Sequence, residues 1–132
     1  MSKQKIYLAG GLTNNWHNKV ISKFEDKFIF FNPRNHNLPE SAMFTTWDLH
    51  FVRQSDILFG YLEKENPSGF GLSLEIGYAK ALGKTIILVD EKSVRDEDFA
   101  NRFKIVRESS NIVLSNFADG LSYLEKYALH LK

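Results

Sequence analysis

Short apolar runs alternate along the chain with longer segments in which apolar residues recur at helical spacing. Runs of four to six apolar, β-branched or aromatic residues are typical of buried strands. We predict strands at residues 5–9, 28–32, 57–62, 85–89 and 111–114. Helical spacing and helix start signals predict helices at residues 14–24, 45–55, 70–82, 99–106 and 117–131.

This alternation predicts a single α/β domain over residues 1–132, because right-handed crossovers between successive strands build a parallel sheet with helices on both faces. Five strands favour a flavodoxin-like three-layer sandwich with strand order 2-1-3-4-5. In such a sheet, ligands bind at the carboxyl ends of the strands, where the strand order reverses. We therefore expect the loops after Ala9 and Leu62 to share one crevice, with Gly10 and Gly11 in the first loop.

The segment from Asn66 to Leu82 contains the strongest candidate for a functional residue. Gly69 and Gly71 allow a backbone to approach a ligand closely. Glu75 lies near the start of the predicted helix, where the helix dipole favours a carboxylate. We expect Glu75 to be charged at neutral pH and to suit the role of a nucleophile. Alternatively, an acid in this position only complements the helix dipole and has no catalytic role, so position alone leaves both interpretations open.

Asp48 is the second candidate acid. It is predicted to lie in the first turn of a helix, opposite in phase to Leu49 and Val52. Paired with Glu75 across one cleft, it would supply the second carboxyl group that glycosyl transfer requires. Its alternative role is to complement the helix dipole. Tyr7, in the first strand, either points into the same crevice or lies in the core.

Other candidates for substrate binding lie at the same predicted edge of the sheet. The polar loop at residues 35–44 has a length that is common in functional loops. Trp16 and Trp47 lie near helix starts, where each either stacks on a nucleobase or belongs to the core or its rim. Asn32, at the end of the second strand, is a further candidate.

Composition narrows the possible functions. The chain has 17 Lys and Arg against 16 Asp and Glu, and no basic stripe, so we expect no polymeric nucleic acid as a partner. It has no cysteine, which excludes thiol catalysis and is typical of a cytoplasmic protein. With no apolar run of membrane-spanning length and no recognisable signal peptide, we expect a cytoplasmic location and no membrane partner. The four histidines lack metal-ligand spacing, so we expect no metal site.

Several motifs together resemble the nucleoside 2-deoxyribosyltransferase family, in order and spacing, over nearly the whole chain. They are Ile6–Gly11, Trp47–Leu49 with Asp56 eight residues beyond Asp48, Gly69–Ala79, and Gly83 and Lys84 before an apolar strand. The most specific part is the Gly-x-Gly-x-x-x-Glu-x-Gly-Tyr-Ala stretch combined with the upstream aspartate. The resemblance implies a flavodoxin-like fold and exchange of the base of a small 2'-deoxynucleoside through a covalent deoxyribosyl-enzyme, without a cofactor or metal.

The resemblance also implies roles for individual residues. Glu75 would attack C1' of the deoxyribose, Tyr7 would orient its carboxylate, and Asp48 would handle the proton of the departing and incoming base. Members of the family assemble as dimers of dimers or larger, and a polar residue from the C-terminal part of a neighbouring subunit completes the sugar site. Asn101 is the best match for that residue, and we expect a homo-oligomer, either a dimer or a tetramer.

One position departs from the transferase pattern. Transferases of the family carry an aspartate six residues before the nucleophile, where it helps to hold the sugar hydroxyls, whereas this chain has Gly69 with Ser68 beside it. In the related 2'-deoxynucleoside 5'-phosphate N-hydrolases a serine there contacts the 5'-phosphate, and Ser68 is one residue out of that register. We favour base transfer, with nucleotide N-glycosidase activity or a non-catalytic nucleotide-binding domain as the alternatives.

Overall fold

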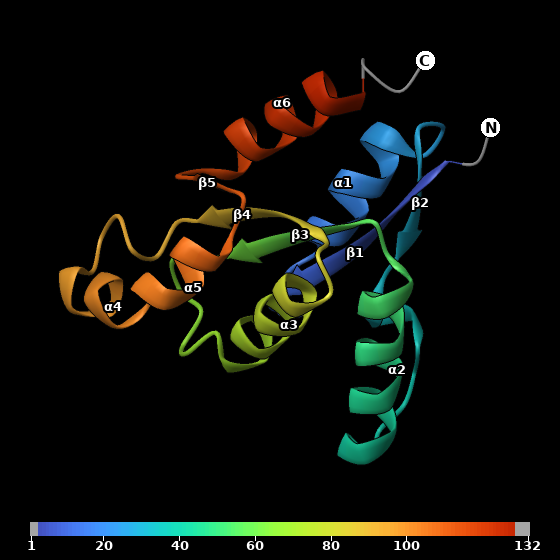
Figure 1. The fold of residues 1–132 in the computed structure, drawn as a ribbon, viewed down its shortest axis with the longest axis horizontal. Helices are drawn as coiled ribbons and strands as arrows, with labels where there is room; N and C mark the ends of the chain where they lie inside the picture. Colours follow the sequence, from blue (N-terminus) through green and yellow to red (C-terminus); the bar gives the residue numbers. More distant parts are fainter. Residues whose placement is uncertain (1–2, 129–132) are drawn as a thin grey trace.

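A five-stranded parallel sheet forms the centre of the protein. The computed structural model describes residues 3–128, and its strand order is β2-β1-β3-β4-β5 (Figure 1). The strands are β1 Gln4–Gly10, β2 Phe28–Phe31, β3 Ile57–Leu62, β4 Thr85–Asp90 and β5 Ile112–Leu114. The predicted flavodoxin-like fold and strand order are confirmed.

Helices cover both faces of the sheet, as Figure 1 shows. One face carries α1 Trp16–Phe24 and α6 Phe117–Ala128. The other face carries α2 Ser41–Gln54, α3 Phe70–Ala81, α4 Glu97–Arg102 and α5 Lys104–Ser109. A short 3₁₀ helix, η1 Pro33–Asn35, follows β2. Within the described residues, no helix is both long and apolar enough to cross a membrane.

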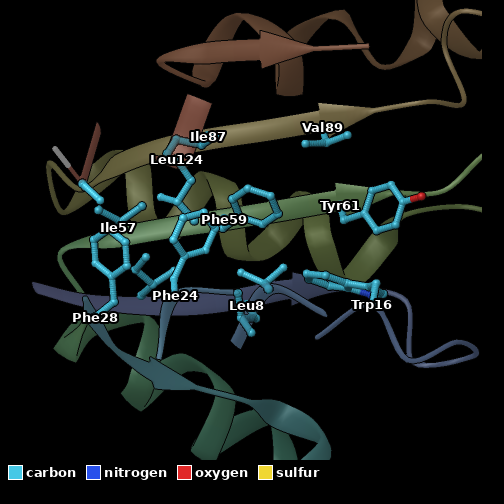
Figure 2. Packing of buried hydrophobic residues seen from close by; sticks show 13 residues of the cluster. Leu8, Trp16, Phe24, Phe28, Ile57, Phe59, Tyr61, Ile87, Val89 and Leu124 are labelled. Atoms are coloured by element: carbon cyan, nitrogen blue, oxygen red, sulfur yellow. The ribbon is translucent and has the colours of Figure 1, made fainter. Parts of the chain in front are cut away.

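Alternation along the strands divides the core into two clusters, because successive side chains point to opposite faces. Leu8 of β1 packs in the cluster beneath α1 and α6, with Trp16 and Leu124 (Figure 2). Tyr7, one residue earlier, packs in the cluster beneath α2 and α3, with Ile76. The face on which a β1 residue lies therefore decides which helices it can contact.

Helix α2 begins earlier than predicted. Its first residue is Ser41, and Glu40 occupies the N-cap position, whereas the sequence predicted a helix that begins near residue 45. The Thr46 hydroxyl donates instead to the carbonyl of Ala42 at 2.8 Å, which is a bond that threonine makes inside a helix. Asp48 is consequently the eighth residue of α2, so the prediction that it lies in the first turn is wrong.

The segment after β4 also differs from the prediction of one helix at residues 99–106. It forms two short helices, α4 and α5, which meet at Phe103. The Asp96 side chain caps α4 by accepting a hydrogen bond from the Phe99 N–H at 3.0 Å, so α4 begins two residues earlier than predicted. Helix α6 is described to Ala128, and its predicted end at residue 131 lies outside the described residues.

His17 of α1 is a buried base, and we expect it to make the fold sensitive to acid. Its side chain is 0% exposed, its ring stacks on Trp16 with centroids 3.8 Å apart, and neither ring nitrogen has a hydrogen-bond partner among the described residues. Burial, with a smaller effect from the charge of Arg34, lowers the pKa of His17 from 6.5 to about 4.

Between these two pKa values the unfolded chain binds a proton that the folded protein excludes. The contribution of His17 to stability is therefore intact above pH 6.5 and decreases as the pH falls towards 4, by on the order of 3 kcal/mol in total. Urea unfolding of His17→Phe, which keeps an aromatic ring against Trp16, should show a smaller loss of stability between pH 7 and 4.5 than the unmodified protein. His50→Phe, at an exposed position of α2, is the control. Equal pH dependence in His17→Phe and the unmodified protein would contradict this account.

Candidate active site

A cleft of about 320 Å³ opens near the carboxyl end of β1, between α2 and α3. Its walls come from four parts of the chain that are distant in sequence: β1 with the loop after it, the segment after β2, helix α2 and helix α3. The lining residues are Tyr7, Gly10, Leu12, Pro33, His36, Leu38, Phe44, Asp48, Gly71, Leu72 and Glu75.

The cleft brings together the three candidate catalytic residues. Tyr7 reaches it from β1, Asp48 from α2 and Glu75 from α3. The Tyr7 hydroxyl donates a hydrogen bond to Glu75 Oε2 at 2.7 Å. Asp48 and Glu75 line the same cleft, and the charge of Asp48 raises the pKa of Glu75. Two carboxyl groups and a hydroxyl thus face one small space.

The expectation that Glu75 is charged at neutral pH is wrong. Helix α3 begins at Phe70, so Glu75 is its sixth residue. The helix dipole acts most strongly in the first turn, and Glu75 lies beyond it. Burial raises the pKa of Glu75 to about 8, and the charge of Asp48 adds to this effect. The hydrogen bond from Tyr7 lowers the pKa but does not offset burial.

Asp48 and Tyr7 respond to the same environment. Burial raises the pKa of Asp48 above 3.8, while His36 and the Tyr7 hydroxyl act in the opposite direction. The pKa of Tyr7 is raised far above its ordinary value by burial and by the two carboxyl groups, so Tyr7 remains a hydrogen-bond donor. Because neighbouring carboxyl groups do not ionise independently, Asp48 and Glu75 titrate as a pair.

Two of the four candidate glycines line the cleft. Gly10 has φ +145°, and a Cβ there would lie 2.3 Å from the carbonyl oxygen of Tyr61, so no other residue fits at this position. Gly71 leaves open space at the start of α3, since nothing lies within 4 Å of a Cβ placed there. Gly69, with φ +70°, forms the N-cap of α3, while Gly11 faces the Glu63 side chain. Neither Gly69 nor Gly11 lines the cleft.

Neither candidate tryptophan lines the cleft. Trp16 is 2% exposed and lies on the opposite face of the sheet, where its Nε1 donates to the Gly11 carbonyl at 2.8 Å. It therefore supports the loop after β1 and has no free face on which a base could stack. Trp47 adjoins Asp48 on α2, but its side chain lines a separate apolar hollow together with Met43 and Phe51.

Three other substrate-binding candidates also lie outside the lining of the cleft. Asn32 is buried, and its Oδ1 accepts a hydrogen bond from the Arg34 N–H at 3.0 Å, which caps η1. The backbone N–H of Ser68 donates to Asn66 Oδ1 at 3.1 Å in the loop before α3. Asn101 is exposed on α4.

The cleft also contains residues that the sequence did not single out. The range 35–44 was predicted to be a functional loop from its length and polarity. Three of its residues line the cleft: His36 and Leu38 before α2, and Phe44 within α2. His36 Nε2 lies 3.7 Å from Asp48 Oδ1. The polarity of this range predicted a functional loop, but no local pattern in the sequence distinguishes His36 from its polar neighbours. In the part of the chain that the structure describes, no three His, Asp or Glu side chains are placed to hold a metal ion.

Comparisons with solved structures extend the likeness to the whole fold. A 2-deoxyribosyltransferase from Bacillus psychrosaccharolyticus is 24% identical with a TM-score of 0.67, over 94% of this chain and 95% of that one. A 2-deoxyribosyltransferase from Leishmania mexicana is 18% identical with a TM-score of 0.72, over 98% and 99%. The CMP N-glycosidase of Clostridium botulinum is 22% identical with a TM-score of 0.64, over 94% and 100%.

At these identities the structures show a shared fold, whereas the sequence itself shows the family. No match was found among curated protein sequences. Residues 3–93 match the profile of the family described as "Nucleoside 2-deoxyribosyltransferase like", and this segment contains all the residues that line the cleft. The match covers more than half of the chain, so the protein belongs to the nucleoside 2-deoxyribosyltransferase-like family.

Proposed function

We propose that the protein is an enzyme that cleaves the N-glycosidic bond of a 2'-deoxynucleoside and transfers the deoxyribosyl group to another base. The observation that carries this proposal is the pair of carboxyl groups, Asp48 and Glu75, that line one cleft with the Tyr7 hydroxyl bonded to Glu75. Enzymes that transfer glycosyl groups with retention use such a pair, one member as nucleophile and the other as acid and base. Membership of the family supports the same chemistry.

In the first step, Glu75 attacks C1' of the deoxyribose. The bond between C1' and the base nitrogen breaks, its electron pair goes to the base, and Asp48 donates a proton to the base. The product is a deoxyribosyl ester of Glu75. The transition state is oxocarbenium-like, and a 2'-deoxy sugar tolerates this charge better because it lacks the electron-withdrawing 2'-hydroxyl.

In the second step, a different base attacks C1' of the ester, and Asp48 takes up the proton that this base releases. Glu75 departs as a carboxylate, so atoms and protons balance over the cycle. Attack by water instead would give free deoxyribose, and the enzyme would then be an N-glycosidase.

The active form requires an ionised Glu75 and a protonated Asp48, which is one proton on the pair. Tyr7 supports the ionised form of Glu75, because its hydrogen bond to Glu75 Oε2 stabilises the carboxylate and leaves Oε1 for the attack on C1'. The volume of the cleft, about 320 Å³, is at the lower end of the range for small-molecule sites. Gly10 and Gly71 line the cleft without side chains, which allows the sugar to approach the backbone there.

A homo-oligomer, either a dimer or a tetramer, forms part of the proposal. Asn101 is exposed and outside the cleft of its own chain, so the role proposed for it is in the cleft of a second copy. Large apolar side chains on α3 and α5 support contact between copies, since Phe70, Leu74 and Ile105 are 81%, 61% and 77% exposed.

Chromatography of reaction products tests the proposed function. The purified protein is incubated with each 2'-deoxynucleoside and each 5'-monophosphate, with and without a second free base. We expect a new nucleoside to form only when the acceptor base is present. Free base that accumulates without an acceptor would show hydrolysis, and a requirement for the monophosphate would identify a nucleotide substrate. No product from any substrate would contradict the enzymatic proposal and favour a nucleotide-binding domain.

A further inference from the structure

His36 is an ionisable residue of the cleft to which the mechanism above assigns no role. It follows η1, and its side chain and that of Asp48 are 12% and 21% exposed. His36 Nε2 lies 3.7 Å from Asp48 Oδ1. Asp48 Oδ1 is buried and has no hydrogen-bond partner among the described residues. His36 Nε2 is therefore positioned to donate a hydrogen bond to it.

The orientation of the His36 ring is set by its surroundings. Nδ1 accepts a hydrogen bond from the Leu38 N–H at 3.0 Å, and an acceptor nitrogen carries no proton. The hydrogen-bond geometry therefore assigns the proton of the neutral ring to Nε2, the nitrogen that faces Asp48. The ring is also parallel to the Phe44 ring, within 4°, and makes a T-shaped contact with the Trp47 ring, with centroids 5.3 Å apart.

We propose that His36 is a positioning residue that acts through Asp48 and directs the proton of Asp48 to the leaving base. The proposal rests on the proposed function. Contact between Nε2–H and Oδ1 holds the carboxyl group on one side, which leaves Oδ2 as the oxygen that carries the proton towards the base. The separation of 3.7 Å exceeds a direct hydrogen bond, and we expect it to shorten when substrate binds, as catalytic contacts commonly do.

This role fits the electrostatics of the cleft. Its ionisable side chains are Tyr7, His36, Asp48 and Glu75. Tyr7 bonds to Glu75, so His36 contacts only one member of the carboxyl pair, and it opposes the effect of burial on that member. During the first step the proton moves from Asp48 to the base nitrogen, and Asp48 becomes an anion. The Nε2–H of His36 then stabilises this new charge, and the second step returns the proton to Asp48.

The dependence of rate on the leaving group tests this role. His36→Phe keeps an aromatic ring between Phe44 and Trp47 and removes Nε2, whereas His36→Gln retains an N–H donor at a similar reach. The substrates are 2'-deoxynucleosides that the unmodified enzyme accepts, chosen for bases of different basicity, together with 4-nitrophenyl 2-deoxyriboside, whose leaving group departs without a proton. Purified His36→Phe is first checked for cooperative thermal unfolding.

We expect His36→Phe to lower kcat/KM by about 10- to 100-fold for the most basic leaving group. This loss is smaller than the ~100- to 10,000-fold rate enhancement of a general acid, because Asp48 itself is still present. The loss should shrink as the leaving group becomes more acidic, and His36→Gln should recover part of the rate. His50→Phe, on the same helix as Asp48 but outside the cleft, should react like the unmodified enzyme.

Two outcomes would overturn this inference. An equal loss for every leaving group would show that His36 only supports the loop, and an unchanged rate would show that it has no role. Absence of turnover in the unmodified enzyme would instead contradict the proposed function itself, so the two failures are distinguishable.

Discussion

Replacement of Glu75 by glutamine is expected to abolish turnover and to stabilise the protein at pH 8 in the same variant. Turnover is lost because an amide oxygen is a poor nucleophile and the glycosyl ester cannot form. Stability rises because glutamine removes a carboxyl group that the fold keeps largely out of water, while its side-chain oxygen still accepts the hydrogen bond from Tyr7.

The direction of the stability change follows from the pKa of Glu75. Burial raises this pKa from 4.5 to about 8 in the folded protein. Between these values the unfolded chain has lost the proton that the folded protein retains, so stability decreases as the pH rises from 4.5 to 8. The loss amounts to about 5 kcal/mol at most, and glutamine does not incur it. The benefit of Glu75→Gln should therefore be large at pH 8 and small at pH 4.5.

Thermal and urea unfolding at the two pH values measure this effect, with product chromatography on the same samples. Glu65→Gln is the matched control, since the Glu65 side chain is 80% exposed and its replacement should change neither property. Mass spectrometry of the unmodified enzyme, mixed with substrate and quenched with acid, should show an added deoxyribosyl group that Glu75→Gln lacks. Full turnover in Glu75→Gln would exclude Glu75 as the nucleophile, and equal stability at both pH values would contradict its raised pKa.

Replacement of Asp48 by asparagine is expected to change the shape of the pH profile as well as the rate. In the unmodified enzyme the active form has one proton on the carboxyl pair. At low pH both groups are protonated and Glu75 cannot attack; above pH 8 both are ionised and no acid remains. We therefore expect a bell-shaped dependence of kcat/KM on pH, with its falling limb near the pKa of about 8.

Asp48→Asn removes the acid and the negative charge together. For 2'-deoxynucleosides, kcat/KM should fall by about 100- to 10,000-fold, the usual contribution of a general acid. The charge of Asp48 raises the pKa of Glu75, so Glu75 should ionise at a lower pH in the variant. The remaining activity should then rise with pH to a plateau and lose the falling limb.

The measurement is kcat/KM from pH 5 to 9.5, with 4-nitrophenyl 2-deoxyriboside as the substrate that needs no acid. On that substrate, Asp48→Asn should retain much more of its rate than on a 2'-deoxynucleoside. Asp56→Asn is the control, since Asp56 is exposed before β3, where its Oδ2 accepts a hydrogen bond from the Lys5 N–H at 2.8 Å. A falling limb that persists in Asp48→Asn would assign it to another group and remove Asp48 from the role of acid.

Local patterns in the sequence were sufficient to predict the five strands, most of the helices and two of the reacting groups, although the start of α2 and the division between α4 and α5 were missed. Strands buried on both faces leave continuous apolar runs, and helices packed on one face leave a regular spacing, so both can be recognised without tertiary contacts. The alternation of the two types predicted the sheet order, and the order placed the site at the end of β1. Glu75 and Asp48 were found because each is an acid close to that edge.

Tertiary structure alone decided how these groups behave and what surrounds them. The pKa of Glu75 depends on how much water the packing of α2, α3 and β1 excludes. Burial keeps the Glu75 side chain largely neutral at pH 7, whereas its place in the helix predicted an anion. Trp16 lies on the far face of the sheet because of the position of α1. His36 reaches Asp48 across a loop with no regular spacing. Periodicity is a local property that the sequence records directly, whereas burial and contacts between distant residues arise only when the chain has folded.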